Sequence, residues 1–263
     1  MRNTVSIVLI ALTLTGCEKV VNLKYKDNQS RIIIDGNITN ETGPYFIKIT
    51  KSVNLSNTES NPTVDNAVVK ISDDAGNSET LAPEGSGIYR TNTLIGVVGR
   101  TYTLTVLAEN QTYTAQSTMP QQVPFDSIKI EKVVTSSETE YNLVPVYNDP
   151  TQKGNNYRFA LLVNNKPVNQ HFIQNDQLRN GEANSFRLEI NGDDLKIKSA
   201  DSIEITMQCI DQKVAAFYST LVLMADSGPG GGTTPSNPQS NISNGAMGLF
   251  SAHTVQKNIK VVQ

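Results

Sequence analysis

Short runs of alternating apolar and polar residues recur along most of the chain, and this period of two constrains the fold more than any other feature. Successive side chains of a strand point to opposite faces, so each run predicts a strand with one buried face. Such runs begin at Arg31 and are clear at residues 45–50, 67–71 and 101–106. Segments rich in Gly, Pro, Asn and Asp, which predict turns, separate them at 40–44, 73–77 and 83–87.

Short strands separated by turns indicate a mainly β protein made of antiparallel sheets. Residues 31–120 are predicted to form a β-sandwich of immunoglobulin-like or transthyretin-like size. Pro120 and Pro124 interrupt strand pairing and mark a predicted boundary. Residues 124–263 are predicted to form a second β-rich domain. Its expected strands lie at 127–132, 157–163, 186–190, 203–209 and 258–262.

Residues 212–224 break the strand pattern. Apolar side chains recur there near helical spacing, with two alanines and neither Gly nor Pro, so we expect a short helix that Asp211 caps. The following residues 227–240 are rich in Gly, Pro, Ser and Thr and predict a mobile surface loop. Residues 241–252 predict a turn that feeds a strand, so the loop is an excursion from the domain.

The N-terminus carries the most specific motif of the chain. An apolar stretch follows the positively charged start, and the sequence LTGC at 14–17 closes it as in bacterial lipoprotein signal peptides. Residues 1–16 are predicted to be removed after Gly16, and the thiol of Cys17 to receive acyl chains. An uncleaved membrane-spanning helix would need about 20 apolar residues, more than this stretch has. We expect residues 17–30 to tether a folded body to a membrane outside the cytoplasm.

Charge and cysteine content narrow the functional classes. The chain has 22 Lys and Arg against 25 Asp and Glu and no basic cluster, so nucleic acid is not an expected partner. Of its 2 cysteines, Cys17 is assigned to lipid. Cys209 alternates with Ile203, Ile205 and Met207 and is predicted to be a buried, unreactive thiol. Without a disulfide, an exported domain has to rest on its hydrophobic core.

Catalysis by acid–base, nucleophilic or metal chemistry requires titratable groups that converge in space. His171 and His253 are the only histidines, and neither has a second ligand at metal-binding spacing. No nucleophile elbow, phosphate-binding loop or dinucleotide fingerprint occurs. The acidic pairs at 73–74 and 193–194 lie beside glycine and predict solvated turns, with weak calcium binding as the alternative. The sequence thus predicts no catalytic residue, no metal and no cofactor.

A series of short segments occurs in an order that resembles one known family. They are CEKVV at 17–21, IIDGNI at 33–38, GPY at 43–45, DNAVVKISD at 65–73, GIYR at 87–90, GRTYTL at 99–104, YTA at 113–115, NI at 241–242 and GLFSA at 248–252. Their shared order spans nearly the whole mature chain and resembles the Bacteroidota lipoprotein family named domain of unknown function 4249. The resemblance implies an outer-membrane lipoprotein whose relatives often accompany TonB-dependent outer-membrane barrels, and it supplies no catalytic residues.

The anchor and the resemblance lead to a main hypothesis and two alternatives. The main hypothesis is a non-enzymatic binding or accessory subunit of a TonB-dependent barrel complex in nutrient uptake. It would be anchored in the outer membrane at the cell surface or on the periplasmic face, with an unknown ligand. The alternatives are a structural accessory of an outer-membrane assembly or secretion machine and an enzyme with an unrecognised site. A partner surface is expected on loops, namely 227–240, 54–63 and 148–156.

Overall fold

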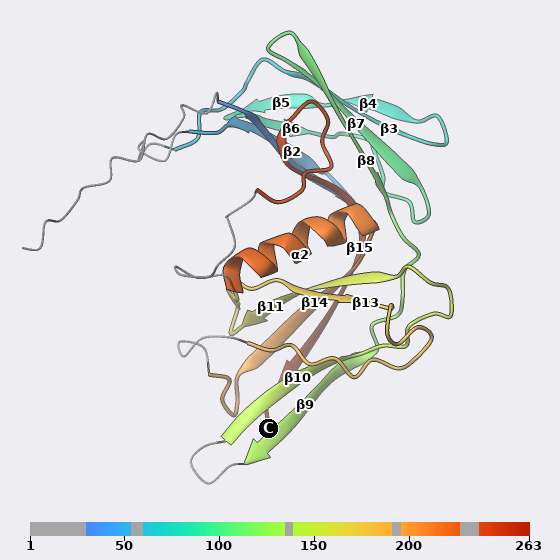
Figure 1. Cartoon of the computed structure of the whole chain (residues 1–263), viewed down its shortest axis with the longest axis vertical. Coiled ribbons are helices and arrows are strands. Elements are labelled where there is room, and N and C mark those ends of the chain that lie inside the picture. Colours follow the sequence, from blue (N-terminus) through green and yellow to red (C-terminus); the bar gives the residue numbers. More distant parts are fainter. Residues whose placement is uncertain (1–29, 54–59, 135–138, 191–195, 227–236) are drawn as a thin grey trace, which may run out of the picture.

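A computed structural model describes residues 30–53, 60–134, 139–190, 196–226 and 237–263. Within these ranges the chain is mainly β, with several sheets and the helix α2 (Figure 1). This confirms the predicted fold class. The predicted lipidation and cleavage residues, Cys17 and Gly16, and the acidic pair at 193–194 lie outside the described residues. No helix in the described part of the chain has the length and apolar character needed to cross a membrane.

The first lobe is a β-sandwich. A sheet with the order β4-β3-β7-β8 packs against the strands β1, β2, β6 and β5. Ile34 and Ile47 from one sheet and Ile71 and Leu104 from the other share one buried cluster. The strands of this lobe are β1 Ile32–Thr39, β2 Phe46–Lys51, β3 Val68–Asp73, β4 Ser78–Thr80, β5 Ala82–Gly85, β6 Ile88–Arg90, β7 Thr101–Ala108 and β8 Gln111–Thr118.

The second lobe is a sheet covered on both faces. Phe159 and Met207 point from the sheet into a buried cluster with Leu143 of the two-stranded β9–β10 sheet. On the opposite face, the sheet residue Arg158 lies against Tyr218 of the helix. The elements of this lobe are β9 Ser127–Val134, β10 Thr139–Val146, β11 Asn156–Val163, β12 Lys166–Pro167, β13 Phe172–Asn175, β14 Ser202–Ile210, α2 Gln212–Asp226 and β15 Met247–Val261.

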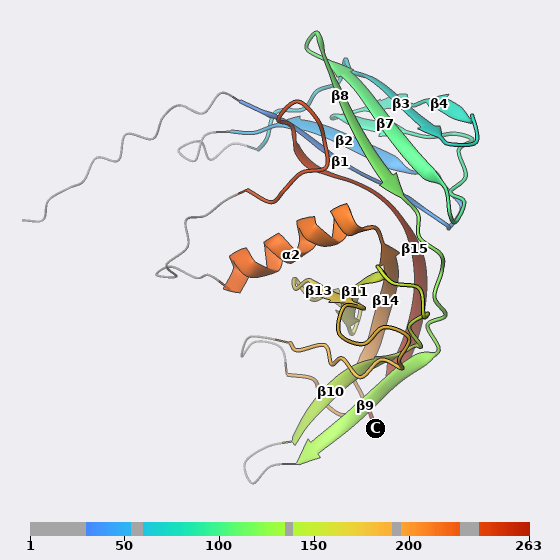
Figure 2. The ribbon, with the colours of Figure 1, turned by 45° about the vertical axis from the view of Figure 1, so that its right-hand side comes forward.

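Strand β15 connects the two lobes. Its first half pairs in parallel with β1, from Ile33–Met247 to Thr39–His253. Its second half pairs antiparallel with β14. Figure 2 shows β15 curving from one lobe into the other, with α2 on its concave side. The sheet is therefore continuous through both lobes, in the order β12-β11-β14-β15-β1-β2-β6-β5.

The C-terminal segment differs from its prediction in two respects. The expected strands within 241–252 and at 258–262 are parts of one 15-residue strand, because the polar residues between them pair with neighbouring strands. The prediction also places all of residues 124–263 in the second domain. Phe250 and Ala252 instead belong to the buried cluster of the first lobe, because the parallel pairing with β1 brings them there.

Residues 186–190 do not form the predicted strand. Leu188 is buried, as the alternation predicted, but the backbone makes only an isolated bridge to Leu143. The reason lies in Asn184, whose side-chain amide donates to the carbonyl of Pro145 at 2.6 Å and accepts from the N–H of Phe186 at 2.9 Å. These side-chain bonds replace the ladder that would continue the sheet.

The helix prediction is confirmed. Helix α2 begins at Gln212 and extends two residues beyond the expected end, to Asp226. The carboxylate of Asp211 accepts a hydrogen bond from the N–H of Val214 at 2.9 Å, which is the expected cap. Val214 and Ala215 are buried, and Phe217 and Tyr218 pack beside them. The helix is thus held by its cap and by one apolar face.

Candidate functional site

The site begins at the outer edge of strand β8. An edge strand leaves backbone groups unpaired, and proteins commonly cover such edges. Here Ser243 covers the edge by two hydrogen bonds to Thr114. The N–H of Ser243 donates to the carbonyl of Thr114, and the Oγ of Ser243 accepts from the N–H of Thr114, each at 2.8 Å. The side-chain amide of Asn244 donates to the carbonyl of Thr112 at 2.6 Å. A short irregular segment therefore blocks the edge without adding a full strand.

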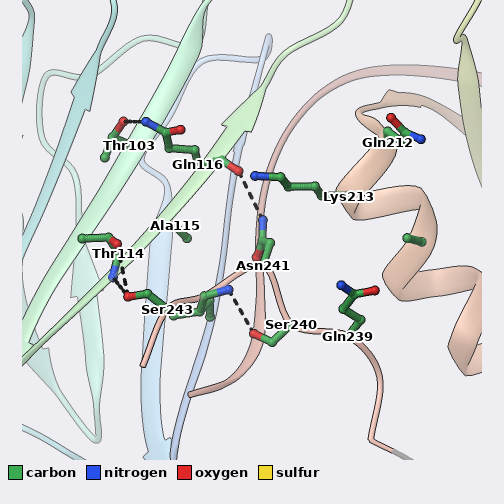
Figure 3. Close-up of a pocket in the computed structure, with 12 residues that line it drawn as sticks. Thr103, Thr114, Ala115, Gln116, Gln212, Lys213, Gln239, Ser240, Asn241 and Ser243 are labelled. Carbon is green, nitrogen blue, oxygen red and sulfur yellow. Dashed lines mark hydrogen bonds between the residues drawn. The ribbon is translucent and has the colours of Figure 1, made fainter. Parts of the chain in front are cut away.

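A polar groove of about 650 Å³ lies between this segment, β8 and α2. Figure 3 shows amide and hydroxyl side chains of β8 and of this segment facing one another, and Lys213 extending from the helix toward β8. The groove is lined by Thr103, Thr114, Ala115, Gln116, Gln212, Lys213, Ala216, Gln239, Ser240, Asn241, Ile242 and Ser243.

Asp211 holds the helix against β8 at one end of the groove. Besides capping α2, its carboxylate accepts hydrogen bonds from the hydroxyl of Ser117 at 2.5 Å and from the N–H of Thr118 at 3.0 Å. One side chain thus fixes the start of the helix to the edge of the sandwich. Two of the three walls of the groove, β8 and α2, are preorganised, because they are regular elements.

A second hollow of about 500 Å³ lies on another side of the same helix. Gln212 and Ala216 line both hollows, so the first turns of α2 separate them. Lys153 and Gly154 contribute from the loop that precedes β11, and Asn156 contributes from the start of that strand. Two of the three predicted partner loops, 148–156 and 227–240, therefore reach the surroundings of α2, the latter through its described residues 237–240. Of the third, residues 54–59 lie outside the described chain.

The two hollows differ in the ionisable side chains that line them. Among the described residues that line the groove, Lys213 is the one ionisable side chain. In the second hollow, the carboxylate of Asp176 accepts from the N–H groups of Gly154 at 2.6 Å and Asn155 at 3.0 Å and so holds a turn. The groove thus offers neutral hydrogen-bonding groups and a single cation, Lys213, to a polar ligand.

Asp73 ends strand β3 and holds the turn that follows it, but its side chain is only 3% exposed, whereas the sequence predicted a solvated turn residue. Its carboxylate accepts from the N–H groups of Ala75 and Asn77 and forms an ion pair with Arg100. Burial raises the pKa of Asp73, but the hydrogen bonds from Asn77 and Arg100 outweigh burial and lower the pKa to about 2. In the part of the chain that the structure describes, no three His, Cys, Asp or Glu side chains are grouped to hold a metal.

The two histidines lie close to one arginine, which their separation in sequence did not indicate. The Nδ1 of His253 is 2.9 Å from the hydroxyl of Ser251. Burial, and then the charge of Arg158, lower the pKa of His253 to about 4. The same two causes lower the pKa of His171, whose ring centroid is 5.2 Å from that of Tyr218. Neither histidine lines the polar groove.

Cys209 is buried on the same face as Ile203, Ile205 and Met207, which confirms its predicted position. The N–H of Val123 donates to its Sγ at 3.5 Å. Burial raises the pKa of the thiol, so the nucleophilic thiolate is disfavoured.

The profile of the family described as "Domain of unknown function (DUF4249)" matches residues 18–259, and the chain belongs to this family. This confirms the resemblance found in the sequence. A comparison with curated proteins gives no match. Among solved structures, the chain is similar to a two fibronectin type-III domain segment from chicken tenascin, with 11% identity and a TM-score of 0.24. That similarity covers 68% of this chain and 90% of the tenascin segment, and it is too slight to carry an argument.

Proposed function

We propose that the mature chain is a lipid-anchored, non-enzymatic binding or accessory subunit that works with a TonB-dependent β-barrel of the outer membrane. The motif at 14–17 supports the anchor. Each buried CH₂ of an acyl chain contributes about 0.8 kcal/mol to membrane attachment, so two or three chains on Cys17 anchor a protein stably. The partner class rests on the resemblance to lipoproteins that accompany such barrels.

The groove between β8 and α2 is the observation that carries the binding role. Sites for small ligands are concave, largely preformed and about 300–1,000 Å³ in volume. The groove has about 650 Å³ and lies between a sheet edge and a helix that Asp211 joins. Its neutral amide and hydroxyl groups orient a polar ligand by hydrogen bonds, and in this proposal the chain catalyses no reaction of that ligand.

A pair of substitutions on one helix tests the groove. Ala216→Trp places a large side chain in the wall shared by both hollows, whereas Ala225→Trp adds the same side chain at an exposed position near the end of α2. A strain that lacks the chain is first screened for the single nutrient whose use is lost. We expect Ala225→Trp to restore growth on that nutrient and Ala216→Trp to fail while still reaching the membrane. Equal restoration by both variants would remove the groove from the function.

Fractionation and mild cross-linking test the anchor and the partner. We expect the native protein to co-purify in mild detergent with a barrel protein of much larger mass, and Cys17→Ser to leave the membrane fraction. A native protein recovered only as a free monomer after cross-linking would contradict the proposal. Loss of many outer-membrane proteins on depletion would instead identify an assembly or secretion accessory.

A further inference from the structure

A smaller hollow, of about 300 Å³, lies where β15 crosses from one lobe to the other. It shares no lining residue with the polar groove. Arg158 of β11, Gln208 of β14 and His253 of β15 line it together with Tyr218 of α2 and Asp35 of β1. This hollow has two side chains of opposite charge in its lining, Arg158 and Asp35, whereas the polar groove has only Lys213.

Arg158 has an unused hydrogen-bond donor. One terminal nitrogen, Nη1, donates to the side-chain carbonyl of Gln208 at 2.7 Å. The guanidinium carbon lies 4.4 Å from the centroid of the Tyr218 ring. The Nε–H is buried and has no hydrogen-bond partner within the described residues. Leaving a buried donor unpaired costs about 1–3 kcal/mol, and more for a charged group, so such a group calls for a partner.

The positive charge of Arg158 is also unpaired. No carboxylate of the described ranges lies within ion-pair distance of its guanidinium. Burial and the charge of Arg158 lower the pKa of the two histidines near it, His171 and His253, which disfavours a second positive charge there. A guanidinium presents its N–H groups in a planar fork that matches a carboxylate or a phosphate.

Asp35 limits the charge that the hollow accepts. It lies on β1, three strands along the sheet from β11. Its register partner on β2 is Lys48, which offsets part of its charge. The carboxylate of Asp35 repels a monoanion beside Arg158 less than it repels a dianion, because the repulsion energy scales with the product of the charges.

We propose that this hollow binds a carboxylate group of a small ligand or of a peptide C-terminus, with Arg158 as the main contact. The carboxylate accepts from Nε–H and from the free terminal N–H groups, and Gln208 and Tyr218 hold the guanidinium plane in place. This site does not depend on the anchor, the barrel partner or the polar groove.

Titration followed by NMR tests the site in the full mature chain carrying Cys17→Ser. Sodium acetate is the probe, and sodium chloride at equal ionic strength is the control. We expect a saturable shift of the Arg158 Nε–H resonance with acetate, with a Kd on the order of millimolar, and no saturable shift with chloride. Absence of a saturable shift in the wild type would overturn the proposal, whatever the variants do.

Charge variants identify the contact. In the variants, acetate binding is followed by the backbone N–H resonance of Gln208, which lines the hollow. Arg158→Gln should weaken acetate binding about tenfold or more, the loss expected for a charge-assisted hydrogen bond. Arg187→Gln, which removes an exposed arginine paired with Glu131, is the matched control and should bind as the wild type does. Asp35→Asn should tighten binding about twofold. Equal affinity in Arg158→Gln and the wild type would overturn the assignment.

Two further probes define the ligand. Inorganic phosphate that binds more tightly than acetate would overturn the choice of a carboxylate. Triglycine with a free C-terminus, compared with amide-capped triglycine, separates the two carboxylate sources. Tighter binding of free triglycine than of acetate would support a peptide terminus, and equal binding would support a small acid.

Discussion

The two lobes treat their buried polar groups differently. In the first lobe, buried phenols bond to the backbone: Tyr89 donates to the carbonyl of Val64 at 2.7 Å and accepts from the N–H of Ala67 at 2.9 Å. In the second lobe, the phenol of Tyr157 donates to the carboxylate of Asp149, and Arg158 keeps an unpaired N–H. Near neutral pH these phenol bonds do not titrate, and the buried carboxylate of Asp73, whose pKa is lowered to about 2, loses its stabilising bonds only in strong acid. Buried ionisable side chains make the other lobe sensitive to protonation and to ligands.

The largest expected effect comes from a substitution at the junction of the two lobes, where β15 pairs with β1. Gly248 of β15 has a φ of 96°, and a Cβ there would lie 2.1 Å from the carbonyl oxygen of Ile34. Gly248→Ala should therefore lower the free energy of unfolding by more than about 3 kcal/mol, measured by urea denaturation. Gly76→Ala is the control, because its φ is 90° but no atom lies within 4 Å of the added Cβ. We expect it to cost about 1 kcal/mol, and equal losses would refute the close approach.

The next effect is a loss of stability in acid caused by His253. Its pKa is lowered from 6.5 to about 4 in the folded chain, so the unfolded chain binds the proton more readily between these values. The free energy of unfolding should fall as pH decreases from about 6.5 to 4, by up to about 3 kcal/mol. The measurement is urea denaturation across this range. His253→Gln should flatten the dependence, and an unchanged slope in that variant would contradict the assignment.

Removing one hydroxyl from each lobe sharpens the comparison directly. Tyr157→Phe leaves the buried carboxylate of Asp149 with the N–H of Gly181 as its remaining donor, and should cost about 2 kcal/mol. Tyr89→Phe removes neutral bonds and should cost about 1 kcal/mol. Both values come from chemical denaturation at pH 7. A larger loss in Tyr89→Phe would reverse the distinction between the lobes.

The smallest expected effect lies at the covered edge of β8. Ser243→Ala removes the acceptor for the N–H of Thr114 but keeps the backbone bond to its carbonyl. We expect the free energy of unfolding, measured by thermal denaturation, to fall by about 0.5–1 kcal/mol. The loss is small because water can replace the hydroxyl at this exposed site. A loss several times larger would mean that the segment supports the sandwich as strongly as a strand does.

Local patterns determined much of this protein. Alternation at 45–50, 101–106 and 203–209 is sufficient to predict strands β2, β7 and β14, because one buried face imposes a period of two. Helical spacing and Asp211 likewise define α2 and its cap. The order of weak motifs along the chain identified the family.

Tertiary structure alone decided where these elements meet. The polar residues in the middle of β15 interrupt the alternation, so the sequence pattern did not predict one continuous strand. The strand continues there because its backbone pairs with β14 and β1. The groove and the Arg158 hollow each combine side chains from segments far apart in sequence. Period and composition report which side chains are buried, but they carry no information about which distant strands pair. Both sites arise from that pairing, so only the folded chain brings their residues together.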